Sequence, residues 1–216
     1  MSRTARWTVA VLIVIAALVV ALALQLRDSD SAPDAPAGLG GQGVARDHRD
    51  ADTAQALSGP RAEAKLAPCP AAGRGDGPPA LRGITLECAG DGTPVDVAKA
   101  LAGRTTVLNL WAYWCGPCAD ELPAMAEYQR RVGDRVTVLT VHQDENETAG
   151  LLRLAELGVR LPTLQDGRRL IAAALRVPNV MPATVVLRSD GSVAEILPRS
   201  FANADEIAAA VNPGLP

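Results

Sequence analysis

The 216-residue sequence predicts an α/β domain with a central mixed β-sheet flanked by helices. Segments with the pattern of buried strands alternate with segments of helical spacing, in the order strand–helix–strand, helix, hairpin and helix. Two cysteines, Cys115 and Cys118, stand at the first of these strand–helix junctions. They follow the apolar run Thr106–Leu110 and precede Ala119–Arg130, in which apolar residues recur at helical intervals.

Composition limits the class of protein. The length suits one domain of ordinary size plus extensions. Hydrophobic residues make up 48% but aromatic residues only 3%, so we expect a core of Val, Leu, Ile and Ala. The net charge is −3, and no basic block occurs beyond the short N-terminus, so nucleic acid is not expected as a partner. Four cysteines, an even number, are compatible with an oxidising compartment.

The N-terminus predicts a membrane anchor. Arg3 and Arg6 lie in a cytoplasmic segment, residues 1–6, and the apolar stretch 7–26 follows as a single-pass transmembrane helix. About 20 residues span a hydrocarbon core of about 30 Å, and positive charges before the stretch keep the N-terminus inside. The alternative is a signal peptide cleaved at Ala21-Leu22-Ala23. We favour the anchor because the stretch exceeds a normal signal core; a lipoprotein is excluded because no cysteine follows it. The remaining chain is then extracytoplasmic, held at the cell membrane.

Residues 27–68 are expected to be a flexible tether, and residues 69–214 the folded domain. The tether is rich in Ala, Gly, Pro, Asp and Ser and has few large apolar side chains with which to repay the cost of ordering. A weak helical pattern covers Arg49–Leu66, and His48 is interpreted as a solvated linker residue.

The elements of the domain follow from periodicity and from turn residues. Strands are expected at 81–88, 105–110, 136–142, 163–165, 183–188 and 193–197. Helices are expected at 95–101, 115–132, from 144–148 through 157, after 165 through 176, and at 204–211. Gly90-Asp91-Gly92 and Ser189-Asp190-Gly191-Ser192 mark turns, and Gly103 and Gly158 end helices.

The two cysteines are predicted to form a redox-active pair. In the first turn of a helix, Cα atoms three residues apart lie about 5 Å from each other, within the range that a disulfide tolerates. Cys115 at the helix N-terminus is favoured as the thiolate that attacks. Cys118, one turn inside, is expected to be buried and to resolve the mixed disulfide. Pro117 suits a first helical turn, and Trp114 is expected to shield the disulfide.

A static disulfide or half of a zinc site are the alternatives. A structural zinc site takes four ligands, and the sequence offers no second C-x-x-C motif or histidine cluster. His142 at a strand end is expected to be structural. No metal or other cofactor is therefore expected. A second motif, Met181-Pro182, precedes the strand at 183; on its own it would be an ordinary trans proline, since about 5% of X–Pro bonds are cis.

The stretch from Val107 to Cys118, followed by Glu121-Leu122-Pro123, closely resembles membrane-anchored thiol–disulfide oxidoreductases of the TlpA/ResA type, with a thioredoxin-like fold. The resemblance runs from about residue 81 to 211. Asn109 stands where cytoplasmic thioredoxins carry a buried Asp. The resemblance implies that Glu121 lies near the site and exchanges a proton with Cys118, with a solvated helix Glu as the alternative.

The resemblance also implies the substrate contacts. Pro182 is expected to be cis, and the backbone of Met181 to pair with a bound substrate strand opposite Cys115. The residues expected to contact substrate are Trp114, Gly116, Pro117, Met181 and Pro182.

Two features depart from the family pattern. Gly116-Pro117 is the dipeptide found in thioredoxins, so the reduction potential does not carry over from the family. Cys69 and Cys88 have no counterpart in the minimal pattern. We expect them to form a structural disulfide closing a loop of about 20 residues and contributing roughly 3 kcal/mol. A second redox pair that relays electrons to Cys115 is the alternative.

The predicted function is reduction of disulfides in exported proteins, including those of cytochrome c maturation, with electrons from a membrane carrier of the CcdA/DsbD type. The same dithiol could run as a disulfide oxidase or isomerase. A thiol peroxidase would need Thr where Ala112 stands. A Cu(I) chaperone usually has wider cysteine spacing and a later His, and no His follows His142.

Overall fold

The computed structural model describes residues 52–211. The predicted anchor at 7–26 lies outside this range, and among the helices of residues 52–211 none is long and apolar enough to cross a membrane. The helices are α3 (Ala54–Ala64), η1 (Pro79–Leu81), α4 (Val97–Leu101), α5 (Gly116–Val132), η2 (Gly133–Arg135), α6 (Glu147–Glu156), α7 (Leu170–Leu175) and α8 (Ala204–Val211). The strands are β1 (Thr85–Cys88), β2 (Pro94–Asp96), β3 (Thr106–Trp111), β4 (Thr137–His142), β5 (Thr163–Gln165), β6 (Ala183–Leu187) and β7 (Val193–Leu197).

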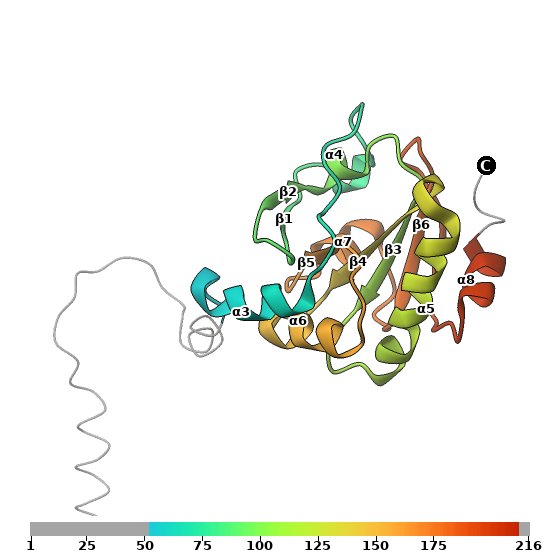
Figure 1. The fold of residues 1–216 in the computed structure, drawn as a ribbon. Helices are drawn as coiled ribbons and strands as arrows, with labels where there is room; N and C mark the ends of the chain where they lie inside the picture. The colour runs from blue at the N-terminus through green and yellow to red at the C-terminus, as the bar shows by residue number, and fades with distance from the viewer. Residues whose placement is uncertain (1–51, 212–216) are drawn as a thin grey trace, which may run out of the picture. The chain divides into compact units, whose positions relative to one another are not determined.

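The seven strands form one mixed sheet in the order β2-β1-β5-β4-β3-β6-β7. The central strands β3, β4 and β5 are parallel, and the strands outside them pair antiparallel. All six residues of β3 are buried, as expected of a central strand covered on both faces. The thioredoxin-like fold, with a mixed sheet flanked by helices, is therefore confirmed (Figure 1).

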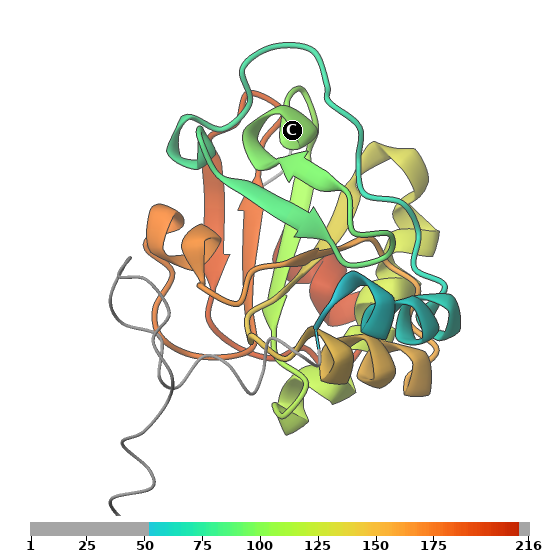
Figure 2. The ribbon, with the colours of Figure 1, turned by 90° about the vertical axis from the view of Figure 1, so that its left-hand side faces the viewer.

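Helices cover both faces of the sheet, and the side chains of β3 alternate between them. Leu108 and Leu110 belong to the core that includes α4 and α7. Val107 and Trp111 belong to the core that includes α5 and α8. Figures 1 and 2 show α5 and α8 together on one side of the sheet, which places the dithiol helix directly over the odd-numbered residues of β3.

One row of buried polar side chains crosses the sheet beneath α5. Thr184, Asn109, Thr140 and Thr163 are register partners on β6, β3, β4 and β5. All four residues are buried, and the hydroxyls of Thr140 and Thr163 lie 2.7 Å apart in a hydrogen bond. Asn109 has the same parity along β3 as Val107 and Trp111, so its amide faces α5.

Helix α3 occupies the end of the segment that the sequence analysis assigns to a flexible tether. It packs along α6, as Figures 1 and 2 both show, and buries Leu57 and Ala64. Arg61 reaches from α3 to the carboxylates of Glu87 on β1 and Glu147 on α6. Residues 54–64 thus belong to the packed structure, and the expectation of a tether differs from the structure there.

The first hairpin also differs from expectation. The predicted strand at 81–88 begins only at Thr85, since residues 79–81 form a 3₁₀ turn and Gly83 has φ +79°. The predicted helix at 95–101 is divided: Val95 pairs with Leu86 in the short strand β2, and the helix begins at Val97. Asp96 caps this helix by accepting a hydrogen bond from the Lys99 N–H at 3.1 Å.

Candidate active site

The dithiol lies at the N-terminus of α5. Cys115 and Cys118 are joined in a disulfide with Cα atoms 5.2 Å apart, close to the separation expected from the helical spacing. Cys115 is the N-cap residue, and its Sγ accepts a hydrogen bond from the Cys118 N–H at 3.2 Å. Cys115 is 6% exposed and Cys118 fully buried, so an incoming thiolate or disulfide meets the Cys115 sulfur first.

The position of Cys115 favours its ionised form once the disulfide is reduced. Free backbone N–H groups and the positive end of the helix dipole point at its sulfur. Pro117 stands in the first turn, where the N–H that proline lacks would have no helical partner. Gly116 and Pro117 are exposed beside the sulfur and leave it open to a partner protein.

A fully buried carboxyl lies one turn further along the same helix. Glu121 Oε2 accepts a hydrogen bond from Asn109 Nδ2 at 2.8 Å, and Oε1 accepts one from the Phe201 N–H at 3.2 Å. Its exposed fraction is 0%, so the alternative of a solvated helix Glu is wrong. Asn109, which stands where cytoplasmic thioredoxins carry a buried Asp, therefore helps to orient this carboxyl.

Burial sets the protonation of Glu121. Loss of solvation raises its pKa to about 7, although the two hydrogen bonds and the positive charge of Arg199 act in the opposite direction. A carboxyl with a pKa near neutrality exchanges protons readily at physiological pH. Because Glu121 follows Cys118 by three residues, both side chains lie on the same face of α5.

The Met181–Pro182 peptide bond is cis, as the resemblance implies. Ala183, the next residue, pairs with Leu110 near the end of β3, so Met181 and Pro182 continue alongside the segment that leads into the dithiol. Met181 is partly buried and Val180 is 45% exposed.

Trp114 lies beside the dithiol with 60% of its surface exposed. Its Nε1 donates a hydrogen bond to Asp144 Oδ2 at 2.9 Å. The other side-chain oxygen of Asp144 accepts a hydrogen bond from the Asn146 N–H. The backbone carbonyl of Asp144 accepts one from Gln165 Nε2. The indole is therefore tied to the loop after β4, next to a cavity of about 390 Å³ lined by Tyr113, Gln143, Asp144, Glu145, Asn146 and Gly167.

His142 has a structural environment. Its ring packs 4.8 Å from that of Trp111, and its Nδ1 lies 2.8 Å from Gln165 Oε1 in a hydrogen bond. Burial lowers the pKa of His142, which favours the neutral ring. Within residues 52–211 no group of three His, Cys, Asp or Glu side chains could hold a metal ion.

The second cysteine pair is also a disulfide. Cys69 and Cys88 are bonded, with Cα atoms 5.9 Å apart, so the predicted pairing is present. Cys88 is fully buried in β1, and Cys69 is partly buried on the segment that follows α3. The bond fastens that segment to the sheet.

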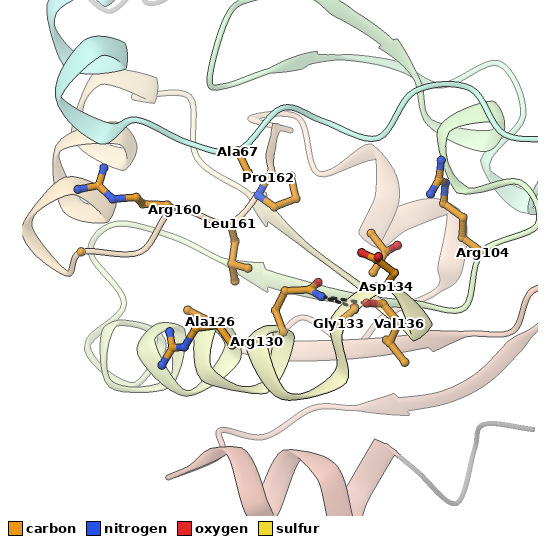
Figure 3. A pocket seen from close by; sticks show the side chains of 13 residues that line it. Ala67, Arg104, Ala126, Arg130, Gly133, Asp134, Val136, Arg160, Leu161 and Pro162 are labelled. Carbon is orange, nitrogen blue, oxygen red and sulfur yellow. Dashed lines mark hydrogen bonds between the residues drawn. The ribbon is translucent and has the colours of Figure 1, made fainter.

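A cavity of about 590 Å³ lies at the opposite end of the sheet from the dithiol (Figure 3). It includes Val136 and Thr137, where β4 begins, whereas the dithiol lies where the parallel β3 ends. Arg104, Arg130 and Arg160 line it together with apolar side chains. No residue predicted for the active site lies in this cavity.

Three residues of the site were not predicted. Asp144 could have been, because it lies two residues after the end of β4, and the carboxyl ends of adjacent parallel strands share one edge of a sheet. Arg199 and Phe201 approach Glu121 from a loop some 80 residues further along the chain. No local pattern marks such a contact.

Comparison with known proteins decides the family. The family model described as Redoxin matches residues 70–208, well over half of the chain. The chain belongs to the Redoxin family. A ResA thiol–disulfide oxidoreductase from Bacillus subtilis is 30% identical over 98 residues, covering 45% of this chain and 54% of the relative. A thioredoxin from Rhodospirillum rubrum is 41% identical over 77 residues, covering 34% of this chain and 68% of the relative.

Solved structures of other proteins share the fold. A secreted Mycobacterium tuberculosis disulfide oxidoreductase homologous to E. coli DsbE is 25% identical, with a TM-score of 0.54 over 62% of this chain and 97% of that structure. StoA from Bacillus subtilis is 18% identical and shows the fold alone, with a TM-score of 0.51 over 61% of this chain and 98% of that structure. The chain spans about half the length of the ResA relative. These relatives support an oxidoreductase of the thiol–disulfide type.

Proposed function

We propose that this protein is an extracytoplasmic thiol–disulfide oxidoreductase that reduces disulfides in exported proteins. The observation that carries the proposal is the asymmetric dithiol: Cys115 caps a helix and keeps 6% of its surface exposed, whereas Cys118 is fully buried one turn before the buried carboxyl of Glu121. This arrangement suits one attacking and one resolving sulfur.

The reaction transfers two electrons from the dithiol to the substrate. The Cys115 thiolate attacks one sulfur of the substrate disulfide, forming a mixed disulfide and releasing the other sulfur as a thiolate. Cys118 then loses its proton to the Glu121 carboxylate and attacks Cys115 Sγ. The second substrate sulfur leaves, Cys115 and Cys118 end as a disulfide, and the proton on Glu121 returns to a leaving thiolate by way of the solvent.

The substrate lies across an apolar surface around Cys115. Trp114 and Val180 are two of the large hydrophobic side chains that remain substantially exposed in residues 52–211. Trp114 directly precedes Cys115, and Val180 precedes Met181, which packs against the core cluster that contains both cysteines. Gly116 and Pro117 offer little side-chain bulk, and Met181 and Pro182 provide backbone next to the end of β3. An extended substrate segment can therefore pair with the Met181 backbone while its disulfide faces Cys115.

The predicted anchor at 7–26 supports a place outside the cytoplasmic membrane, where a reductase needs a supply of electrons. A membrane carrier of the CcdA/DsbD type is the proposed donor, and apocytochromes c are one proposed class of substrate. The names of the ResA and DsbE-like relatives support the chemistry.

Trapping in cells tests the proposal. Replacing Cys118 with Ala leaves Cys115 unable to release its partner, so exported proteins should accumulate as mixed disulfides with Cys115. The double variant Cys115→Ser/Cys118→Ala is the matched control, since serine keeps the helix cap without the thiol, and it should trap none. A Cys118→Ala protein that forms no mixed disulfide with exported proteins would contradict the proposal.

The direction of electron flow is tested by equilibrium with glutathione. A reductase should have a potential in the range of thioredoxin, about −270 mV, and a value near that of DsbA, about −120 mV, would indicate an oxidase instead.

A further inference from the structure

We propose that Arg199 controls the charge of the Glu121 carboxyl, and that Phe201 holds Arg199 in the position from which it does so. The two are positioning residues for the proton step at Cys118. The inference rests on the proposed function and adds to it the residues that set the protonation of Glu121.

The loop between β7 and α8 closes over the carboxyl. Phe201 donates its backbone N–H to Glu121 Oε1 at 3.2 Å, and its ring is 1% exposed in the core that contains Cys115 and Cys118. Together with the 2.8 Å bond from Asn109 Nδ2, both carboxyl oxygens have a neutral donor. These donors orient the carboxyl, but they carry no full charge.

The same loop carries the cation. The Arg199 guanidinium lies 4.2 Å from the centroid of the Phe201 ring, in a cation–π contact. Arg199 is exposed, and among residues 52–211 no Asp or Glu side chain lies within salt-bridge distance of it. One residue, Phe201, thus touches the carboxyl with its backbone and the cation with its ring.

While Cys115 and Cys118 are joined in a disulfide, the elements around Glu121 bring no competing charge. Asn109 and its register partners Thr140 and Thr184 are neutral, and Cys118 on α5 is neutral both as a thiol and in the disulfide. Arg199 is the charged side chain whose field acts on the carboxyl, and it favours the carboxylate over the acid. It therefore opposes the burial that raises the pKa.

The direction of the effect follows from the proton balance. Glu121 can accept the Cys118 proton only as a carboxylate, so the resolving step is faster above the pKa of Glu121. Without the Arg199 cation the carboxylate is less stable, and its pKa rises. The pH at which resolution reaches half of its maximum rate then rises by the same amount.

The experiment follows the Glu121 carboxyl itself. The full chain is labelled with ¹³C-glutamate, oxidised and titrated by NMR, and the spectrum of Glu121→Gln identifies the signal. Arg199→Gln should raise the midpoint by up to about 0.5 pH unit, the size expected for one solvent-exposed charge. Arg199→Lys keeps the positive charge and should bring the midpoint most of the way back to that of the unaltered protein. Phe201→Leu keeps the backbone N–H but removes the ring, and should give a midpoint between those of Arg199→Gln and the unaltered protein.

Arg130→Gln is the matched control. It removes the same charge at the far end of α5, beside the cavity of Figure 3, and should leave the midpoint unchanged. The rate at which Cys118 resolves a mixed disulfide should also be measured against pH. The pH of half-maximal rate should rank the variants in the same order as the Glu121 midpoints. If Phe201→Leu does not fold, the Gln and Lys variants of Arg199 decide the question.

Two failures are distinguishable. An unchanged Glu121 midpoint in Arg199→Gln overturns the role of Arg199, whatever the activity. If instead the midpoint moves but the pH profile of resolution is the same in Glu121→Gln as in the unaltered protein, the proton step of the proposed function is wrong.

Discussion

At the scale of single residues, the buried carboxyl of Glu121 couples folding to pH. In the unfolded chain its pKa is near 4.5, and in the folded protein it is about 7. Between these values the folded state binds more protons than the unfolded state, so the contribution of Glu121 to stability is full below pH 4.5 and is lost as the pH rises to 7. The size of this loss is about 3 kcal/mol.

The substitution Glu121→Gln should remove this dependence. In the oxidised protein, the free energy of unfolding of the variant relative to the unaltered chain should increase by about 3 kcal/mol between pH 4.5 and 7.5. Urea unfolding at several pH values measures it. Glu147 also has a pKa raised to about 7, chiefly by burial, but it is present in both proteins, so the difference between them isolates Glu121. Parallel stability curves would contradict the prediction.

At the scale of elements, the contact between α6 and β4 requires a glycine. A Cβ on Gly150 would lie 2.8 Å from Cε1 of His142, whose ring is held by Trp111 and Gln165. The ring cannot yield without breaking these contacts, so α6 can approach β4 this closely only at a residue without a side chain.

Gly150→Ala should therefore destabilise the domain by about 1 to 2 kcal/mol, since overpacking outweighs the gain in helix propensity. Thermal or urea unfolding measures the change. Gly59→Ala in α3 is the control, because apart from its chain neighbours nothing lies within 4 Å of the added Cβ; it should change stability by less than about 1 kcal/mol, since crowding by Pro60 offsets the gain in helix propensity. A stabilising Gly150→Ala would show that the ring moves freely.

Most elements could be predicted from the sequence, including the edge strand β7 at 193–197, but the opposite edge strand β2 and helix α3 could not. The strands at β3, β4 and β6 and the helices at α5 and α8 have long apolar patterns and fall within one or two residues of the expected bounds. Residues 94–96 form β2 only because β1 is available to pair with them, and a three-residue strand has no periodicity of its own. Helix α3 has a weak pattern as well, and tertiary contacts through Leu57 and Arg61 determine its place.

The candidate site divides in the same way. The dithiol, Glu121 and Met181-Pro182 carry signals within a few residues of sequence, and each lies at the site. Phe201 and Arg199 reach the site through the packing of the β7–α8 loop against α5, which depends on the whole fold. No spacing in the sequence encodes that packing.

At the scale of the whole molecule, the Cys69–Cys88 disulfide joins the segment after α3 to the sheet. It closes a loop with a sequence separation of 19 residues. Constraint of the unfolded chain by a loop of this length stabilises the folded state by roughly 3 kcal/mol.

The double variant Cys69→Ala/Cys88→Ala should lose about 3 kcal/mol of stability and keep its thiol–disulfide oxidoreductase activity at temperatures well below unfolding. Urea unfolding and reduction of a model disulfide protein measure the two properties. Preserved stability together with slow re-reduction of Cys115 by a membrane electron donor would instead support an electron relay through the second pair.

The cap of α5 has a consequence for the design of inactive variants. The atom that closes the helix terminus is also the nucleophile, because Cys115 Sγ accepts the Cys118 N–H. Serine offers an oxygen in the same place, so Cys115→Ser removes the chemistry while retaining a terminus that the helix needs. Alanine removes both and weakens the helix by about 1 kcal/mol. Any comparison that uses alanine at this position therefore mixes lost reactivity with a frayed first turn.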